Sequence, residues 1–459
     1  MKLVYTIIGL LLTEFCFSQV FYIDDYLKVV RSNHPIAKQA LIGIKKAEAD
    51  LLTAKGGFDP IINTNASRKT FDGKNYYFYT NPEIKIPTWI GADIKAGLEN
   101  NGGQFLSSES TSGQTSYLGV TLPVAKGLLL DKRRATLQQA RILREQSEQE
   151  QLSAVNDLLF NAYQAYWQWA GRYQLLSIYS KFVTIAENRF RLVKIGFQNG
   201  DRSAVDTIEA LTQVQQFSLL QNEALLELTN SALELSNYIW DEKDSAFLLS
   251  PQYIPDTLSF AKFVVLPDEA SLIREALSTN PQLRIYDYKL NALEIDRKLK
   301  RQNILPSIDL KANLLNKGYN VFKGWNSALF QNNYAWGIDF KFPLFIREGR
   351  GEYKKATLKI SETNYELSLK RRETENKLRS YFNETRQLQQ QVIISEQAYR
   401  NYQAMLNAEN LKFYNGESSL FLINTRENKL IEIAEKLVSL RIKYLKSRYA
   451  VEWSAGLLR

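Results

Sequence analysis

The sequence predicts a mainly α-helical protein with β-strands, built as a tandem repeat of two long antiparallel helical hairpins that are each preceded by strands. One observation is a helical pattern over residues 128–240, broken by a turn at Asn199-Gly200. Another is the return of this design over residues 351–453, with a turn at Asn415-Gly416. The third is the alternation of apolar and polar side chains ahead of each hairpin.

Residues 1–18 are predicted to form a secretory signal peptide. Lys2 precedes an apolar run over residues 3–12, and the small residue Ser18 stands where a signal peptidase would cut. The run is too short to span a bilayer. Cys16 is the only cysteine, and the residue before it is not the small one that lipidation requires, although lipidation stays open. Cleavage after Ser18 leaves a chain without thiols, and hence without disulfides or cysteine metal sites.

The composition is that of a folded protein, with 45% hydrophobic, 23% charged and 12% aromatic residues in a chain of 459. The formal net charge of +9 would indicate nucleic-acid binding if lysines and arginines gathered on one face. Here they alternate with acidic residues along helical stretches, as in Lys370-Arg371-Arg372-Glu373. We therefore predict a solvated helix surface and no nucleic-acid partner.

Residues 58–125 and 304–347 carry the alternation expected of β-strands with one apolar face. The apolar series are Ile308, Leu310, Ala312 and Leu314; Trp336, Ile338, Phe340, Phe342 and Leu344; Leu118, Val120, Leu122 and Val124; and Ile90, Ala92, Ile94, Ala96 and Leu98. Such alternation is typical of membrane-spanning strands, and a soluble β-sandwich is the competing interpretation. The first segment is the longer one because it contains an additional stretch at residues 76–100.

An internal repeat organises the chain. Pro35 matches Pro281 at an offset of 246 residues, and the turn at Asn199-Gly200 matches the turn at Asn415-Gly416 at an offset of 216. Each half is therefore predicted to contain a short helix, strands, a long helix, a turn and a returning helix. Three prolines within residues 241–267 mark a connecting segment between the halves.

The helices carry a coiled-coil seam, in which apolar residues are spaced by alternating fours and threes. Its members are Val155, Leu159, Ala162, Tyr166, Trp169, Tyr173 and Leu176 in the first hairpin, and Leu430, Ile433, Leu437, Leu440 and Tyr444 in the last helix. Further apolar residues flank the seam, and a single neighbouring helix cannot cover them. The strands are also too few to close a barrel. Both shortages are met if several copies contribute strands to a shared β-barrel and hairpins to a shared helical tube.

The two-fold repeat, the strand-to-helix junctions at Leu122-Pro123 and Phe342-Pro343, and the two turns resemble the TolC family of outer-membrane efflux ducts. The resemblance covers essentially the whole chain after the signal peptide, and the turns are its most specific part. In that family three protomers form a trimeric β-barrel in the outer membrane, continued by an α-helical barrel through the periplasm. The resemblance implies a homotrimer in contact with outer-membrane lipid, and as partners a periplasmic adaptor (membrane fusion) protein and an inner-membrane pump.

The function implied is that of an exit duct in a tripartite efflux or type I secretion system, conducting substrates passively and without a cofactor. Drug, metal and protein cargo all stay open, as does the class of pump. Four strands per protomer are implied, with residues 76–100 either adding strands or forming a loop. The predicted segments are a signal peptide (1–18), a periplasmic helix (19–57), barrel strands (58–125), a helical hairpin (126–240), a connecting segment (241–267), and in the second repeat a helix (268–303), barrel strands (304–347) and a hairpin (348–459).

The resemblance places adaptor-docking elements at the two turns. The residues concerned are Asn199, Gly200 and Asp201 in the first turn and Asn415, Gly416 and Glu417 in the second. The two glycines also have the simpler role of supplying the positive φ that ends a helix.

A constriction is expected near the second turn. Some family members narrow this tip with a ring of aspartates, but the matching positions hold Leu422 and Thr425, and only the first-repeat counterpart, Asp206, is acidic. We instead expect an apolar constriction of Leu420, Phe421 and Leu422 that would gate by dewetting, with ordinary coiled-coil packing as the alternative.

An enzyme is not predicted, and no catalytic, cofactor-binding or metal-ligating residue is expected. His34 is the only histidine, which removes most metal and triad chemistry. The competing function is a periplasmic adaptor or a structural coiled-coil protein. Adaptors usually carry one helical hairpin, so the tandem repeat argues against that interpretation.

Overall fold

A computed structural model describes residues 19–319 and 333–459 of the chain. The predicted signal peptide, with Cys16, lies outside the described residues. The chain divides into two compact units. We call them the helical unit, which takes the described residues of 1–41, 152–280 and 372–459, and the sheet unit, which takes those of 42–151 and 281–371.

The internal repeat is present in the structure. Helices α1 (Ile23–Asn33) and α2 (Pro35–Gly56) correspond to α5 (Glu269–Thr279) and α6 (Pro281–Gln302), with every boundary shifted by 246 residues. The predicted single helix at 19–57 is therefore two helices, because a proline at position 35 lacks the amide hydrogen that a continuous helix needs there. The second repeat breaks in the same way at Pro281.

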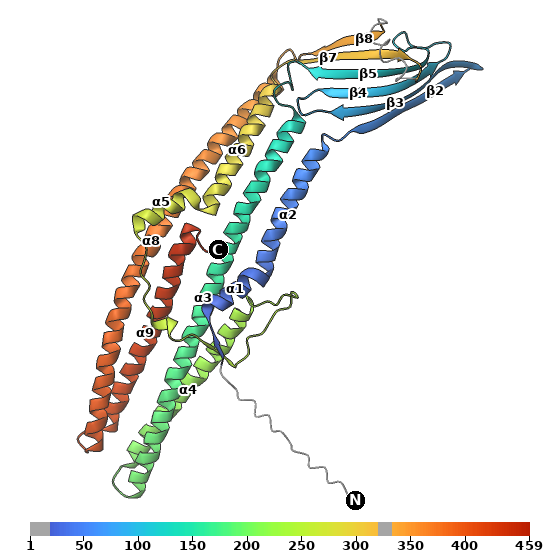
Figure 1. Ribbon diagram of the computed structural model, residues 1–459. Coiled ribbons are helices and arrows are strands. Elements are labelled where there is room, and N and C mark those ends of the chain that lie inside the picture. The colour runs from blue at the N-terminus through green and yellow to red at the C-terminus, as the bar shows by residue number, and fades with distance from the viewer. Residues whose placement is uncertain (1–18, 320–332) are drawn as a thin grey trace, which may run out of the picture. The chain divides into compact units, whose positions relative to one another are not determined.

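The sheet unit contains a six-stranded antiparallel sheet in the order β2-β3-β4-β5-β7-β8 (Figure 1). Its strands are β2 (Ile61–Phe71), β3 (Lys74–Pro87), β4 (Asp93–Gly102), β5 (Gly113–Pro123), β7 (Ser307–Lys317) and β8 (Tyr334–Lys341). The expectation of four strands per chain is thus wrong for this protein. The additional stretch at residues 76–100 belongs to the sheet, as most of β3 and β4, rather than to a loop.

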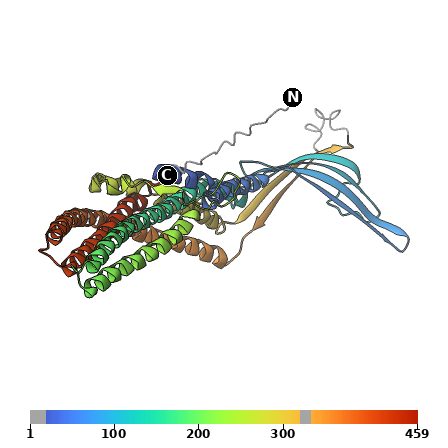
Figure 2. The ribbon, with the colours of Figure 1, turned by 90° about the horizontal axis from the view of Figure 1, so that it is seen from below.

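The register gives the sheet one apolar and one polar face. Ile84 lies opposite Ala96, Ala96 opposite Leu118, and Leu118 opposite Leu314, so the apolar positions line up across neighbouring strands. The alternate positions line up the polar and charged residues, including Glu83, Lys95, Thr121 and Lys311. Figure 2 shows the sheet from another side, where its strands curve strongly. The predicted alternation of apolar and polar faces is confirmed.

The helical unit is built around two hairpins. One is formed by α3 (Lys132–Gln198) and α4 (Ala204–Ser236), the other by α8 (Arg347–Tyr414) and α9 (Leu420–Ala455), and in both the first helix enters the unit from the sheet unit. The predicted connecting segment adds the short strand β6 (Tyr253–Pro255), which pairs in parallel with β1 (Gln19–Phe21), and the 3-10 turn η1 (Ser259–Ala261).

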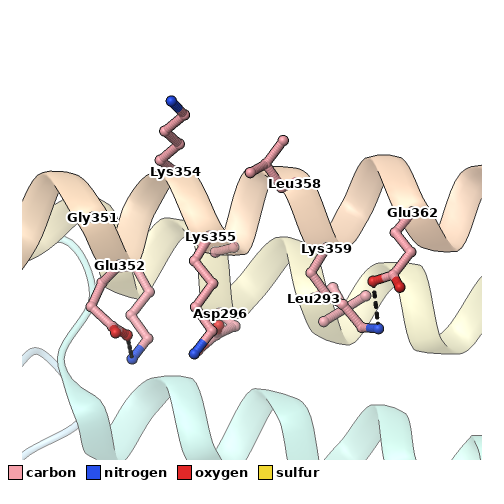
Figure 3. A pocket seen from close by; sticks show the side chains of 11 residues that line it. Leu293, Asp296, Gly351, Glu352, Lys354, Lys355, Leu358, Lys359 and Glu362 are labelled. Carbon is pink, nitrogen blue, oxygen red and sulfur yellow. Dashed lines mark hydrogen bonds and ion pairs between the residues drawn. The ribbon is translucent and has the colours of Figure 1, made fainter.

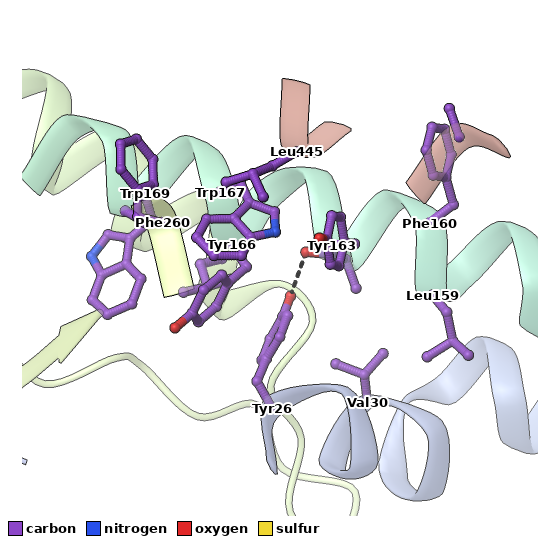
Figure 4. Close-up of a cluster of buried hydrophobic side chains, with 14 of the residues drawn as sticks. Tyr26, Val30, Leu159, Phe160, Tyr163, Tyr166, Trp167, Trp169, Phe260 and Leu445 are labelled. Atoms are coloured by element: carbon purple, nitrogen blue, oxygen red, sulfur yellow. Dashed lines mark hydrogen bonds between the residues drawn. The ribbon is translucent and has the colours of Figure 1, made fainter. Parts of the chain in front are cut away.

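Aromatic side chains of α3 form the core of the helical unit (Figure 4). Five seam residues of α3 are buried as predicted: Val155, Leu159, Ala162, Tyr166 and Trp169. The hydroxyl of Tyr166 donates to the carbonyl of Phe21 at 2.6 Å, which fixes β1 against the helix. Burial raises the pKa of Tyr166 to about 12, so this donor stays protonated at ordinary pH.

None of the helices in the described part of the chain is long and apolar enough to cross a membrane.

Candidate functional site

The two hairpin turns close with the same backbone hydrogen bonds. In the first turn the amide of Asp201 donates to the carbonyl of Gly196 at 2.8 Å, and in the second the amide of Glu417 donates to that of Lys412 at 2.8 Å. Gly200 and Gly416 sit inside these turns with φ values of 86° and 79°. A Cβ atom on either glycine would meet no atom within 4 Å, so the backbone conformation and not lack of space requires glycine.

The remaining turn residues face solvent. The side chains of Asn199, Asp201, Asn415 and Glu417 are all exposed. Each turn is followed by a serine that caps the next helix, since Ser203 accepts from the amide of Asp206 and Ser419 from that of Leu422. The turns are therefore closed by backbone hydrogen bonds, followed by capped helices, and present polar side chains to solvent.

A cation–π contact joins the two tips. The guanidinium of Arg202, in the first turn, lies 4.5 Å from the centre of the Phe413 ring, which belongs to α8. Phe413 in turn packs beside a small cluster of Val193, Ala210 and Leu420. This contact holds both predicted docking turns together within one chain.

A buried ion pair lies behind the tips. Arg189 on α3 donates to both carboxylate oxygens of Glu427 on α9, and also to Asn424 at 3.3 Å. Asn424 donates to Glu209 on α4 at 2.9 Å. The network thus ties α3, α4 and α9. The sequence analysis did not predict this network. Glu427 falls on the apolar seam, four residues after Ile423 and three before Leu430. A charged residue at a seam position is the signal that could have indicated a buried ion pair.

The predicted constriction residues do not share one environment. Leu420 is buried in the cluster with Val193 and Ala210, so its side chain is used in packing within the chain. Phe421 and Leu422 are exposed, with 67% and 40% of their surface accessible. Thr425 is exposed too, and its hydroxyl donates to the carbonyl of Phe421 at 2.8 Å.

The carboxylate of Asp206 has a local partner. It accepts a hydrogen bond from the amide of Ser203 at 3.0 Å and another from the hydroxyl of Ser203 at 2.9 Å. The Ser203 side chain reciprocates toward the Asp206 amide, which completes a capping box at the start of α4. A stabilising role at the helix start therefore accounts for this acidic residue.

A family model described as outer membrane efflux protein matches residues 29–239 and 272–423, which together make up most of the chain. The chain belongs to the outer membrane efflux protein family. This outer membrane efflux protein is thus an exit duct of the outer membrane, with a part that extends into the periplasm. A search of curated proteins by sequence found no match.

Solved structures share the fold of this outer membrane efflux protein. The CmeC outer membrane channel of Campylobacter jejuni is 15% identical with a TM-score of 0.67, covering 95% of this chain and 86% of CmeC. The outer membrane protein VceC of Vibrio cholerae is 13% identical with a TM-score of 0.65, covering 95% and 96%. The open state of the MtrE outer membrane channel of Neisseria gonorrhoeae is 12% identical with a TM-score of 0.66, covering 95% and 89%. At these identities the likeness shows the fold alone.

The sheet of this outer membrane efflux protein has the two faces that a membrane wall needs. Its apolar face is exposed, with Trp336, Ile338 and Phe340 among its most accessible residues. Its polar face is cross-linked by side chains, since Lys85 pairs with Asp93 at 2.9 Å and Lys311 pairs with Asp339. Apolar and polar residues thus alternate along β4, β5, β7 and β8, as in strands that have lipid on one side and water on the other.

An open groove of about 740 Å³ lies between α6 and α8 in the sheet unit (Figure 3). Its charges are largely paired: Lys300 contacts Glu352 at 2.7 Å, and Lys359 contacts Glu362 at 2.7 Å. Apolar side chains such as Leu358 lie open beside them. The groove resembles an uncovered helix surface more than a site for a small ligand. Within residues 19–319 and 333–459, no group of three or more His, Cys, Asp or Glu side chains is placed to hold a metal ion.

Proposed function

We propose that three copies of this outer membrane efflux protein assemble into one duct, which receives substrates from an inner-membrane pump through a periplasmic adaptor protein docked on the two turns. The sheets would jointly line the outer membrane and the hairpins would form the periplasmic tunnel. The observation that carries the proposal is the paired, solvent-facing tips held together by Arg202 and Phe413.

Uncovered apolar stripes support assembly from several copies. On α4 exposed apolar residues are spaced by multiples of seven residues, at Val205, Leu219, Leu226 and Leu233, and Ile208 lies beside them. On α8 of the sheet unit Leu358, Tyr365 and Leu369 are exposed in a similar row. Nothing in the described part of the chain covers these rows, and a second copy of the chain would do so.

The exposed apolar residues near the tips support adaptor docking there. Phe197 precedes the first turn, Tyr414 precedes the second, and both are exposed next to the polar turn residues. A polar rim around apolar anchors is the usual composition of a protein interface.

Assembly is tested by washing membranes with carbonate and measuring the native mass of the detergent-extracted protein. We expect the protein to stay with the outer membrane and to have the mass of three chains. A carbonate-extractable monomer would contradict the proposal.

Docking is tested with a photoreactive amino acid placed at Asp201 or at Glu417, and in a control at the exposed Asp25 of α1. In cells that also produce the pump and the adaptor, the two tip positions should cross-link to the adaptor and the control should not. Equal cross-linking at all three positions would show that the tips have no special role.

A further inference from the structure

The sheet has grown by an insertion in the first repeat. Strand β2 is the counterpart of β7, because both of its boundaries are shifted by 246 residues. In the second repeat β7 pairs directly with β8, the strand that ends just before the long helix. In the first repeat β2 pairs with β3, and β5, which likewise ends before the long helix, pairs with β4. The β3–β4 hairpin therefore lies between two strands that the repeat would otherwise place side by side.

Side chains on the polar face bind the inserted strands to β5. The hydroxyl of Tyr117 on β5 donates to Glu83 on β3 at 2.6 Å, passing across β4. Gly97 on β4 makes this possible, since a Cβ atom there would lie 2.5 Å from the Tyr117 ring. Lys95 on β4 completes the group at 3.7 Å from Glu83. Side chains of β3, β4 and β5 are thus packed against one another.

The apolar face continues across the insertion. Ile84 on β3 and Ile94 on β4 are 42% and 40% exposed, much like Leu118 on β5 and Leu314 on β7 at 45% and 40%. In the single chain, apolar side chains of the inserted hairpin are therefore as accessible as those of the strands that both repeats share. A loop above the membrane would have no reason to keep this apolar row.

We infer that this protein contributes six strands to a closed sheet of eighteen in the outer membrane, through pairing of β2 with β8 of the next copy. The inference rests on the proposed assembly of three copies. Within the described residues β2 and β8 each have one neighbouring strand, so each leaves a row of backbone groups unpaired. Six strands alternate in direction, so β8 and the next β2 meet in antiparallel fashion and closure needs no change of pattern.

The consequence is a wider exit. The diameter of a closed sheet grows roughly linearly with the number of strands, so eighteen strands give a lumen about half as wide again as the twelve expected from four strands per chain. The helical parts need not change, because the insertion begins and ends within the sheet.

Disulfide trapping in the full-length protein tests the strand order, in a Cys16→Ser background that has no other thiol. Cysteine pairs at Ala66 with Thr80 and at Ala96 with Leu118 lie directly opposite each other in the register. If β3 and β4 lay outside the sheet, β2 would pair directly with β5 and Ile62 would lie opposite Val120, as the repeat predicts. If β3 and β4 lie between β2 and β5, Ile62 and Val120 are roughly 14 Å apart, at about 4.8 Å per strand, and a disulfide cannot join them. Bridges in the first two pairs and none in the third are expected, and the reverse would overturn the inference.

The pairing of β8 with β2 of the next copy is tested with Ile338→Cys combined with cysteine at Ile62, Thr64 or Ala66, three positions on the same face of β2. At least one combination should link chains covalently, while the matched Asn63→Cys combination, on the opposite face, should not. If the protein has the native mass of three chains but forms no disulfide at any of the three positions, β8 does not pair with β2 of the next copy. A monomeric native mass would instead reject the proposed assembly, and the intrachain pairs would still report the strand order.

A shortened variant tests the width. Removal of residues 72–112 takes out the inserted hairpin, so that β5 follows β2 along the chain as β8 follows β7 in the second repeat. Thr121→Cys on the polar face is labelled from outside intact cells with maleimide polymers of graded size. We expect the largest polymer that reaches it to be smaller in the shortened variant. If the shortened protein still has the native mass of three chains and the size limit is unchanged, the inference is contradicted. If the shortened protein does not assemble, the disulfide pairs in the full-length protein still test the strand order.

Discussion

Arg189 and Glu427 form a buried ion pair that joins the two hairpins behind their tips, with the Glu427 side chain wholly inaccessible and that of Arg189 10% exposed. Removing one partner of a buried pair leaves an uncompensated charge. We expect Glu427→Gln to lower the free energy of unfolding by about 3–5 kcal/mol. Thermal or chemical unfolding in detergent measures this.

The matched control for that prediction is Glu432→Gln, because Glu432 pairs with Lys429 on the surface of the same helix. Exposed pairs contribute less than about 1 kcal/mol, so this variant should unfold like the parent. Equal destabilisation by both substitutions would show that burial of the Arg189 pair is unimportant.

Gly200 and Gly416 are expected to resist replacement. Alanine at a left-handed position costs roughly 1–2 kcal/mol, so Gly200→Ala and Gly416→Ala should loosen their turns and speed amide hydrogen exchange there. Gly351→Ala, in the interior of α8 with open space around it, should be neutral or stabilising by about 0.5–1 kcal/mol. Unchanged exchange at both tips would contradict the prediction.

Phe421 and Leu422 are the residues on which a constriction now depends, since Leu420 is packed away. We expect Phe421→Ala combined with Leu422→Ala to raise the single-channel conductance in planar bilayers, because smaller side chains make an apolar narrowing easier to wet. Ile394→Ala, which removes an equally exposed side chain of α8 that lies far from the tips in the sequence, is the control. If the double variant conducts like the parent, the constriction lies at other residues.

Gly97 is expected to be irreplaceable in the sheet. Gly97→Val drives a side chain into the Tyr117 ring and should cost about 1–3 kcal/mol through overpacking. Gly337→Val is a matched control on β8, where a Cβ atom meets nothing within 4 Å. The heat stability of the assembled protein on gels measures both. A tolerated Gly97→Val variant would show that Tyr117 is free to move.

His34 should make the helical unit sensitive to mild acid. It is 8% exposed and lies 5.8 Å from the Tyr238 ring, and its Nδ1 accepts from the amide of Ile36. Burial lowers its pKa below 6.5, opposed in part by a hydrogen bond with the backbone of Asn237. The unfolded chain then binds a proton that the folded chain does not, so stability should fall as the pH drops below about 6.5.

The comparison for that prediction is His34→Asn, which removes the only histidine of the chain. The decrease in unfolding temperature between neutral pH and mild acid should be smaller in this variant than in the parent. A decrease of the same size in both would assign the pH dependence to other groups.

Local patterns predicted the parts of the fold that depend on local chemistry. The seam through Tyr166, the two glycine turns and the alternation of the strands all follow from spacing along the chain. The strand order did not follow, because alternation tells which side of a strand is apolar but not which strand lies beside it. For that reason the insertion of β3 and β4 between β2 and β5 could only be seen in the structure.

The candidate site was predictable to a similar extent. The turn residues could be placed because glycine and the following cap are local signals. The contact of Arg189 with Glu427 spans 238 positions, and the separation of Leu420 from Phe421 depends on the rotation of α9 about its axis. The local spacing of residues along the chain predicts neither this contact nor the different environments of Leu420 and Phe421.

The two open edges of the sheet, β2 and β8, also affect how this protein must be made. A single copy in water would expose both rows of unpaired amides and carbonyls together with an apolar face, which is the combination that drives aggregation. When copies assemble in the membrane, edge pairing satisfies the backbone groups of β2 and β8, and lipid covers the apolar face. Newly exported chains should therefore depend on chaperones until insertion, and a surplus of chains over insertion capacity should appear as insoluble protein and not as a pool of monomers.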